Sequence, residues 1–293
     1  LGISLGFLGE EGRTVSGIAF AAQSLLRLGV ALLGVRISAQ LMFGLGLDLI
    51  GLVIAGVVCT IALGLFLGPR LGHTRHFALL TAGSVAICGA AAAMAIAAIL
   101  PQDDRSERRL LFTVMGVTVR STVAMVIYPI LAATLGLDPQ LAGVFLGTTI
   151  HDVAQVVGAG FSVSEEVGEL ATLVKLIRVA MLAPVILVAS LIIRAQMNAA
   201  SPSERPPIMP GFVIGLMVMV PITTYANIPA PLPELGSQVS RWALLAAIGA
   251  VGVKTSLKDV VDVGGKAIGL IVTHTLFIAV FTIVILEIIQ MSR

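Results

Sequence analysis

The chain has 293 residues, of which 57% are hydrophobic and only 12% are charged, with a formal net charge of +2 at pH 7 and a mean hydropathy of +1.05. Because an ordinary soluble domain has about 25% charged residues, a soluble fold of this length could not hide so much apolar side chain. The near-neutral charge gives no reason to expect a nucleic-acid partner. Composition therefore places the chain in a lipid bilayer.

Nine apolar segments are long enough to cross a bilayer as helices, which requires roughly 20 residues each. Only short polar links separate them, and their continuous apolar runs differ from the alternating ten-residue strands of a membrane barrel. The sequence therefore predicts an all-α polytopic membrane protein, a single transmembrane unit over residues 1–293. The predicted spans are 16–36, 47–69, 77–100, 110–135, 140–160, 168–193, 210–229, 237–253 and 265–289.

Two segments of the chain resemble each other, residues 25–56 and residues 243–274. Many secondary transporters are built from internal repeats, with the substrate site near the membrane midplane between them. The alternative is a chance likeness between two helices that are rich in Leu, Ala and Gly. We predict inverted repeat halves at about 1–135 and 140–293.

The segment Ser84–Met94 reads S-V-A-I-C-G-A-A-A-A-M and lies in the middle of the 77–100 span. Small residues permit close helix packing, and a glycine allows the backbone to leave helical geometry. A break here would expose N–H groups at a helix N-terminus, which is a ready site for an anion. A tightly packed continuous helix is the alternative. The candidate substrate-binding residues in this segment are Ser84, Cys88 and Gly89.

Residues 147–158 read G-T-T-I-H-D-V-A-Q-V-V-G and place His151 and Asp152 inside an apolar span. Ionisable groups at that depth cost about 2.5–3.5 kcal/mol each on insertion scales, so they usually serve transport or proton relay. The flanking glycines permit an unwound stretch. We expect His151 and Asp152 to couple a proton, and the alternative is a buried pair that ties two helices together. The candidate substrate-binding residues of this cluster are Thr148, Thr149, His151 and Gln155.

Four basic residues lie within the predicted spans, against one acidic residue, Asp152. If they face an inner cavity, this excess favours anions over cations; if they snorkel to the interface, they carry no such meaning. Arg120, which lies deepest of the four in its span, needs a partner such as Asp152, a substrate anion or water. The four are Arg27, Arg120, Lys175 and Arg178, of which Arg120, Lys175 and Arg178 join the candidate binding residues.

The sequence favours transport over metal binding and over enzyme catalysis. The four histidines show no ligand spacing on one element, so we predict no metal and no other cofactor. We find no set that pairs a nucleophile with a base, and we therefore expect the chain not to be an enzyme.

Three motifs together resemble the sulfate exporter family of bacterial inner-membrane transporters: A-I-C-G-A-A-A-A, G-T-T-I-H-D-V-A-Q-V-V-G-A-G and A-T-L-V-K-L-I-R-V-A-M-L-A-P. The resemblance covers essentially the whole chain. It implies discontinuous crossing helices, as in the sodium/proton antiporter and bile-acid transporter fold. It also implies about eleven spans in the full protein, so that N-terminal spans are missing ahead of Leu1.

The chain departs from that family at three places. The family has I-H-E-T-A-Q where this chain has His151-Asp152-Val153, and A-S-A-I where this chain has Ala90–Ala93. Arg120 stands where an uncharged residue is expected. Because these changes remove a hydroxyl and shorten an acid, they can retune the substrate, so the family resemblance does not by itself assign sulfate to this chain.

From these features the sequence predicts a secondary active transporter that exports sulfate, a related sulfur oxyanion or an organosulfonate, with proton coupling. The alternatives are a cation/proton antiporter of the same fold and a passive anion channel. We expect a multi-pass protein of the bacterial inner membrane, with a small anion as substrate and a homodimer as a candidate assembly.

Overall fold

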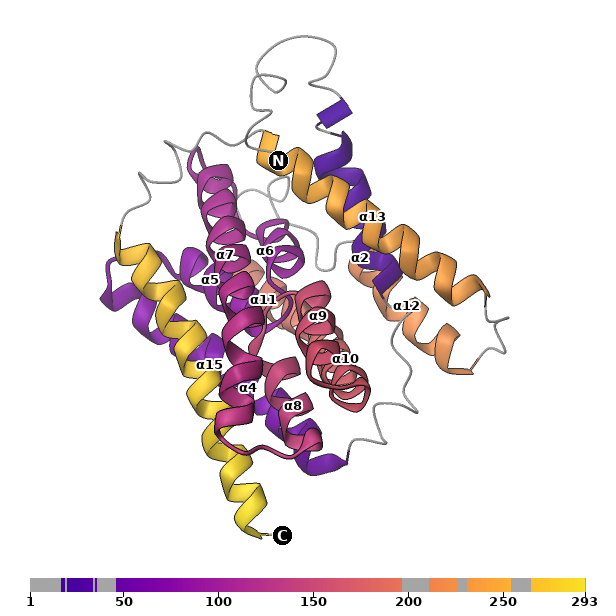
Figure 1. The fold of residues 1–293 in the computed structure, drawn as a ribbon. Coiled ribbons are helices and arrows are strands. Elements are labelled where there is room, and N and C mark those ends of the chain that lie inside the picture. Colours follow the sequence, from indigo (N-terminus) through magenta and orange to yellow (C-terminus); the bar gives the residue numbers. More distant parts are fainter. Residues whose placement is uncertain are drawn as a thin grey trace. The chain divides into compact units, whose positions relative to one another are not determined.

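The computed structural model describes residues 17–18, 20–33, 35, 46–196, 211–225, 231–253 and 265–292. All regular structure in these ranges is helical, which confirms the all-α prediction (Figure 1). In chain order the elements are a π-helical turn η2 (Ala21–Leu25), α2 (Leu26–Leu33), α4 (Leu47–Arg70), α5 (Arg75–Ala86), α6 (Ala90–Ala97), α7 (Ser106–Thr134), α8 (Pro139–Thr149), α9 (Val153–Val163), α10 (Glu165–Ala180), α11 (Leu182–Gln196), α12 (Gly211–Tyr225), α13 (Pro231–Val253) and α15 (Gly265–Ser292).

Four helical stretches of the described chain are long and apolar enough to cross a membrane, and they confirm four of the predicted spans; the third of them joins α10 to α11 through Met181. Their length agrees with the roughly 20 residues that a spanning helix needs. The chain is therefore a polytopic membrane protein. The four stretches are Leu47–Arg70, Ser106–Thr134, Glu165–Ala195 and Gly265–Gln290.

Two other predicted spans are interrupted near their middle. In the 77–100 span, α5 ends at Ala86 and α6 begins at Ala90. In the 140–160 span, α8 ends at Thr149 and α9 begins at Val153. Both breaks fall within the segments where small or polar residues predict them, so the discontinuous helices are confirmed.

The chain divides into two compact units. Unit 1 takes its described residues from 1–39, 94–112 and 182–264, and in it α2 packs against α12 and α13. Unit 2 takes its described residues from 40–93, 113–181 and 265–293. The positions that define the predicted internal repeat, Gly34-Val35-Arg36-Ile37-Ser38 and its counterpart from Gly252, lie mostly outside the described residues, so the repeat stays a prediction.

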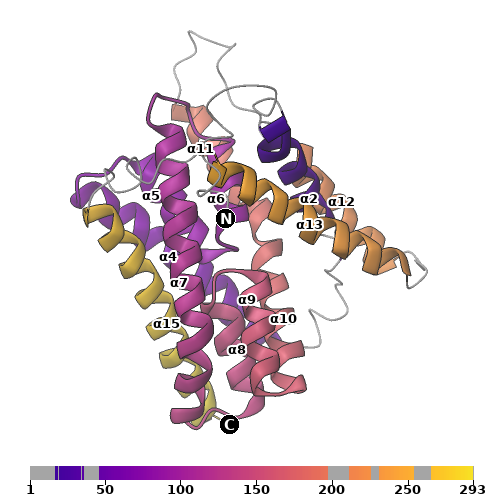
Figure 2. The same ribbon diagram turned by 45° about the horizontal axis from the view of Figure 1, so that its top comes forward.

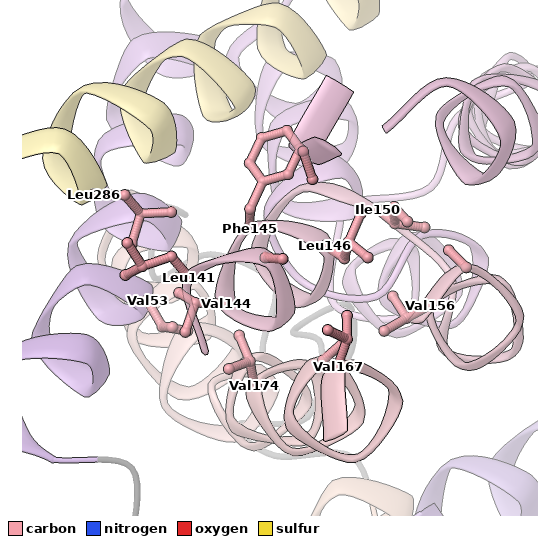
Figure 3. Packing of buried hydrophobic residues seen from close by; sticks show 14 of the residues in the cluster. Val53, Leu141, Val144, Phe145, Leu146, Ile150, Val156, Val167, Val174 and Leu286 are labelled. Carbon is pink, nitrogen blue, oxygen red and sulfur yellow. The ribbon is translucent and has the colours of Figure 1, made fainter. Parts of the chain in front are cut away.

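Within unit 2, α8 packs against α10, α15 and α4, and α5 packs against α4 and α15 (Figures 1 and 2). Figure 3 shows Leu141 and Val144 of α8 gathered with Val53 of α4 and Leu286 of α15. On the other side of α8, Leu146 and Ile150 lie near Val156 of α9 and Val167 of α10 (Figure 3). These buried apolar contacts hold the interrupted span in place, because dispersion contacts between close-packed side chains drive helix association in lipid.

Helix α15 presents two different faces. Leu276, Val280 and Val284 follow each other at a spacing of four residues, and each is about half exposed. The opposite face carries buried residues, among them Ile278 and Leu286. An apolar exposed stripe of this kind suits contact with lipid tails.

Polar side chains fix where three of the helices of unit 2 begin. Thr74, Asp138 and Ser164 each accept a hydrogen bond from the backbone N–H three residues later, at 3.2, 2.8 and 3.2 Å respectively. Such caps satisfy N–H groups that a helix leaves without partners in its first turn. The starts of α5, α8 and α10 are therefore set by local sequence.

Candidate functional site

The break between α5 and α6 depends on a glycine in the left-handed region. Gly89 has φ +68°, and its N–H donates to the carbonyl of Ser84 at 2.8 Å, while Ile87 N–H donates to Gly83 at 3.1 Å. A residue with a side chain is disfavoured at this φ, because its Cβ crowds the following carbonyl. Gly89 thus ends one half-helix and positions the start of the next.

The break between α8 and α9 is held by polar groups from two helices. The Asp152 carboxylate accepts from the N–H of Gln155 at 3.4 Å, as an N-cap of α9. The Ser121 hydroxyl of α7 accepts from the N–H groups of His151 at 3.2 Å and Asp152 at 3.0 Å. The unwound backbone is therefore satisfied inside the protein, as lipid-buried backbone must be.

The two breaks lie against each other. A Cβ placed on Gly89 would stand 3.6 Å from the carbonyl oxygen of His151 and 3.7 Å from its carbonyl carbon. Gly89 precedes α6 and His151 precedes α9, so the N-terminal ends of both second half-helices start from one buried point. We call this region, Ile87–Ala90 together with Ile150–Val153, the crossing.

Two basic side chains of α10 bind the C-terminal ends of both first half-helices. Lys175 Nζ donates to the carbonyls of Ile87 at 2.8 Å and Ile150 at 2.9 Å. Arg178 makes five hydrogen bonds of 2.6–3.2 Å, to Val85, to Ala86 twice, to Gly147 and to Ile150. Both side chains are fully buried.

The donor inventories of these two cations differ. A guanidinium has five N–H donors, and Arg178 makes as many bonds to carbonyls. An ammonium has three N–H donors, and Lys175 uses two of them on carbonyls. One Lys175 donor therefore remains for another group.

In this arrangement the negative and positive ends of the helix dipoles have different surroundings. The C-terminus of a helix carries a partial negative charge and its N-terminus a partial positive one. Lys175 and Arg178 compensate the negative ends of α5 and α8. The positive ends of α6 and α9 stay at the crossing, close to the basic side chains of Lys175 and Arg178, so the crossing favours an anion.

Close helix contact lets α10 reach the crossing. A Cβ on Gly147 of α8 would stand 2.5 Å from the carbonyl oxygen of Ala171 and 2.7 Å from Val174 Cβ. A Cβ on Gly143 would stand 2.8 Å from Leu170 Cβ. Only hydrogen fits at both positions, which is how small residues allow helices to approach in membranes.

The predicted hydroxyl and thiol residues differ in whether their side chains have hydrogen-bond partners within their own helices. The hydroxyls of Ser84 and Thr149 donate to carbonyls one turn earlier in their own helices, Leu80 and Phe145. Thr148 is buried, and its hydroxyl oxygen has no hydrogen-bond partner in the described part of the chain. Cys88 is a buried free thiol in the break between α5 and α6.

His151 is fully buried, and its Nε2 lies 3.1 Å from the hydroxyl oxygen of Thr275 on α15. Gln155 Nε2 donates to the hydroxyl oxygen of Thr122 on α7 at 2.9 Å. These two side chains thus connect the start of α9 and the residues before it to α15 and α7. All ten predicted binding residues and Asp152 belong to unit 2.

Of the three partners considered for Arg120, namely Asp152, a substrate anion and water, Asp152 is not bound to it by an ion pair in the described residues. Arg120 is half-buried on α7, and within the described residues its side chain makes no ion pair. The Asp152 carboxylate instead caps α9, because the first turn of a helix needs an acceptor for its N–H groups. Arg27 lies on α2 in unit 1. Within unit 2, the basic side chains of Lys175 and Arg178 donate hydrogen bonds to the crossing.

Sequence reasoning missed three polar residues of the site. Ser121, Thr122 and Thr275 contact the His151–Gln155 segment from α7 and α15. Their signal was a hydroxyl next to an ionisable residue inside an apolar run, since Ser121 follows Arg120 and Thr275 follows His274. Isolated hydroxyls are common in membrane helices, so only the structure identifies these three.

One short match also needs correction. Residues 2–6 read G-I-S-L-G and have the spacing of the Gly-x-Ser-x-Gly nucleophile motif, which the prediction of no nucleophile overlooked. That motif works on a sharp strand-to-helix turn. Residues 2–6 lie outside the described residues, so the motif has no structural context here.

Comparison with known proteins gives one family. A family model described as Conserved hypothetical protein 698 matches residues 1–271. UPF0324 membrane protein TauZ of Paracoccus denitrificans is 58% identical over 283 residues, which cover 96% of this chain and 84% of that protein. A UPF0324 membrane protein of Rhizobium meliloti is 57% identical over 282 residues, covering 96% and 82%, and one of Chlorobaculum tepidum is 46% identical over 284 residues, covering 97% and 79%. No solved structure matches the chain.

Proposed function

The chain is a multi-pass bacterial membrane protein of the Conserved hypothetical protein 698 family, whose compared members are named UPF0324 membrane proteins, and from this premise we propose that it is a secondary active transporter that exports a small anion. The observation that carries the proposal is the crossing itself. Two interrupted helices turn their N-terminal ends to one buried point, and two buried cations of α10 cap the opposite ends. Interrupted helices at a midplane site are how many secondary transporters bind ions and substrates.

The substrate class follows from charge and from the resemblance to sulfate exporters. Lys175 keeps one donor, Thr148 keeps an unpartnered hydroxyl, and the α6 end supplies a positive helix terminus. These groups suit a sulfonate or another small sulfur oxyanion. Arg178 orders the two half-helices, since its donors are engaged by carbonyls.

Proton coupling is assigned to His151 and Asp152. A histidine changes charge near neutral pH, and an intramembrane carboxylate beside it can share the proton. Both residues lie in the unwound stretch before α9, so a change in their charge acts directly on the crossing. Coupling in this form binds a proton and the anion at neighbouring positions.

The experiment is flux of labelled sulfate, sulfite and 2-aminoethanesulfonate in proteoliposomes of the full chain, with and without a pH gradient. We expect flux of at least one of these anions to rise with the gradient. Asp152→Asn retains a side-chain acceptor for the α9 cap but removes the titrating acid, so it should abolish the pH dependence. Glu169→Gln, an exposed acid on α10, is the matched control and should behave as the parent protein.

Normal, gradient-dependent transport by a His151→Ala, Asp152→Ala double variant would refute the coupling role. Sodium-driven proton movement that is absent with potassium would instead indicate a cation/proton antiporter. Anion conductance that ignores the pH gradient would indicate a passive channel.

A further inference from the structure

His274 of α15 is a buried ionisable residue outside the crossing. It is 0% exposed, and neither ring nitrogen has a hydrogen-bond partner among the residues that the structure describes. A neutral imidazole has one N–H donor and one acceptor nitrogen, so either tautomer leaves a donor and an acceptor unpaired. Buried polar atoms without partners are rare in proteins, so a role for this ring is expected.

The residue also lies deep in the membrane. His274 is the tenth residue of the span Gly265–Gln290, and at about 1.5 Å per residue it stands roughly 14 Å from the start of that helix. The hydrocarbon core is about 30 Å thick, and a histidine side chain is too short to reach the interface from its middle. Ionisable residues at this depth are costly and typically serve proton relays or transport.

Three helices enclose the ring. Helix α15 runs beside α4 and α5 (Figures 1 and 2), and a Cβ placed on Gly64 of α4 would stand 2.9 Å from His274 Nε2 and 3.1 Å from its Cε1. The same Cβ would collide with the Cβ of Ala82 on α5. The ring therefore occupies the space that a side chain at position 64 would fill.

In the described helices that pack against α15, no carboxylate lies near the ring. The segments 60–68 of α4, 78–86 of α5 and 270–278 of α15 contain no Asp, Glu, Lys, Arg or second His, and neither does α8. The acids of α4 and α15 are roughly 24 Å and 20 Å away along their helices. The titratable residues of these helices that lie more than one turn from the contact are Asp48, Cys59, Arg70, Arg75, His76, Lys266 and Glu287.

Another side of α15 faces α7 and the crossing. A Cβ on Gly116 of α7 would stand 3.0 Å from Ile271 Cδ1, and Arg120, a cation, follows one turn later. The crossing contributes His151 and Asp152, of which the Asp152 carboxylate caps α9. The ring nitrogens of α15 at position 274 form no hydrogen bond with any of these three groups.

We propose that His274 is a second proton-binding site of this protein, which takes up its proton when α15 parts from α4 and α5. The contact of these three helices is the form without that proton, because an imidazolium enclosed there would be a buried charge with two unpaired N–H donors. Uptake of the proton therefore favours a conformation in which α15 has moved and both nitrogens have acceptors.

The inference deepens the proposed function and rests on it, because a moving α15 acts on the crossing. Thr275 follows His274 on the same helix, and its hydroxyl oxygen lies 3.1 Å from His151 Nε2. Movement of α15 frees His151 from this contact, after which His151 and Asp152 bind the coupling proton. Because the two steps follow each other, coupling needs both sites and is lost when either is removed.

The first test measures proton binding by nitrogen NMR of labelled histidines in the full chain in liposomes, where the signal that His274→Gln lacks identifies His274. In the parent chain we expect this ring to pass from neutral to protonated between about pH 8 and pH 5, the range in which a histidine changes charge, together with a change in the Thr275 signal. A ring that stays neutral, or that protonates while Thr275 is unaffected, overturns the proposal.

Two glycine variants test the link between proton binding and helix separation. Gly64→Ala places a Cβ against the ring and pushes α15 from α4, so where about one-fifth of the parent rings are protonated its protonated fraction should be at least about twofold larger. Gly51→Ala, on the same helix with nothing within 4 Å, should match the parent. Equal fractions in the two variants overturn the link, and the parent titration does not depend on how either variant folds.

The second test asks whether this proton serves transport. The measurement is the ratio of sulfite or 2-aminoethanesulfonate efflux with a pH gradient to efflux without it, in proteoliposomes. The glutamine of His274→Gln is not protonated near neutral pH, so the ratio should fall to about one, whereas a purely structural defect lowers both rates and leaves the ratio unchanged. His76→Gln, at the start of α5, is the matched control and should keep the parental ratio. A parental ratio for His274→Gln overturns the coupling role.

The two proposals fail differently. If the parent chain moves none of these anions, the proposed function fails, while the NMR titration still decides whether His274 binds a proton. If Asp152→Asn removes the gradient dependence and His274→Gln keeps it, the proposed function stands and this inference alone fails.

Discussion

At the scale of single residues, two basic side chains are buried in the protein, and their hydrogen-bond partners are backbone carbonyls. Lys175 and Arg178 have no buried carboxylate partner in the described hydrogen bonds; seven bonds from their side chains go to carbonyls of interrupted helices. A buried charge is tolerated only when such partners are present. Each cation and the break that it caps therefore require each other.

The variant Arg178→Met tests this dependence on the buried guanidinium. It leaves the carbonyls of Val85 and Ala86 without their side-chain donors, and an unsatisfied buried acceptor costs about 1–3 kcal/mol, so we expect a loss of stability of at least that size. The readout is the thermal midpoint in detergent. Arg75→Met, at an exposed position of α5, should leave it unchanged. An unaltered midpoint for Arg178→Met contradicts the structural role of the guanidinium.

Gly89→Ala tests the left-handed residue at the crossing. We expect a cost of about 1–2 kcal/mol for the conformation, and a further cost because the new Cβ would lie 3.2 Å from Val117 Cγ1. Gly72→Ala, with φ +85° and nothing within 4 Å, carries the conformational cost alone. Equal midpoints for the two variants would mean that the contact with Val117 relaxes freely.

Ser121→Ala removes the acceptor for two buried N–H groups, those of His151 and Asp152. An unsatisfied buried donor costs about 1–3 kcal/mol, so the start of α9 should loosen. Hydrogen exchange of residues 151–156 measures this directly. Ser162→Ala, whose hydroxyl bonds only to a carbonyl of its own helix, is the control, and faster exchange in both variants would argue against a specific role for Ser121.

At the scale of elements, the breaks were predictable and their partners were not. Small residues around Gly89 and polar residues around His151 marked both interruptions, because each segment is locally unsuited to a continuous apolar helix. The capping by Lys175 spans 88 residues to Ile87 and 25 to Ile150. A long-range contact of that kind leaves no local pattern, so the sequence left snorkelling and an inner cavity equally open for this lysine.

Close approach of α8 and α10 offers an element-scale prediction. Gly147→Ala would place a Cβ 2.5 Å from the Ala171 carbonyl oxygen, and overpacking of this kind costs about 1–3 kcal/mol. Because α10 would be pushed from the crossing, transport should fall together with the thermal midpoint. Gly51→Ala on α4 meets nothing within 4 Å and should be neutral or slightly stabilising. Full transport by Gly147→Ala would show that this contact does not position the two cations.

For the whole molecule, composition and apolar run length were sufficient to predict the fold class. They gave the all-α membrane architecture and four membrane spans, because lipid imposes both hydrophobicity and length. They did not decide the partner of Arg120, since an intramembrane cation can be satisfied in several ways and composition does not choose among them. Nor could they place Ser121 and Thr275 beside the His151–Gln155 segment, because these contacts join helices that are far apart in the sequence.

The central claim is that the crossing binds an anion, with the free donor of Lys175 contributing. The most direct measurement is the efflux rate of labelled 2-aminoethanesulfonate and sulfite from proteoliposomes that contain the parent chain, Lys175→Met or the exposed control Lys266→Met, each checked for an intact thermal midpoint. We expect at least about a tenfold loss for Lys175→Met, corresponding to about 1.4 kcal/mol, and parental rates for Lys266→Met. Parental efflux by a folded Lys175→Met variant would contradict it.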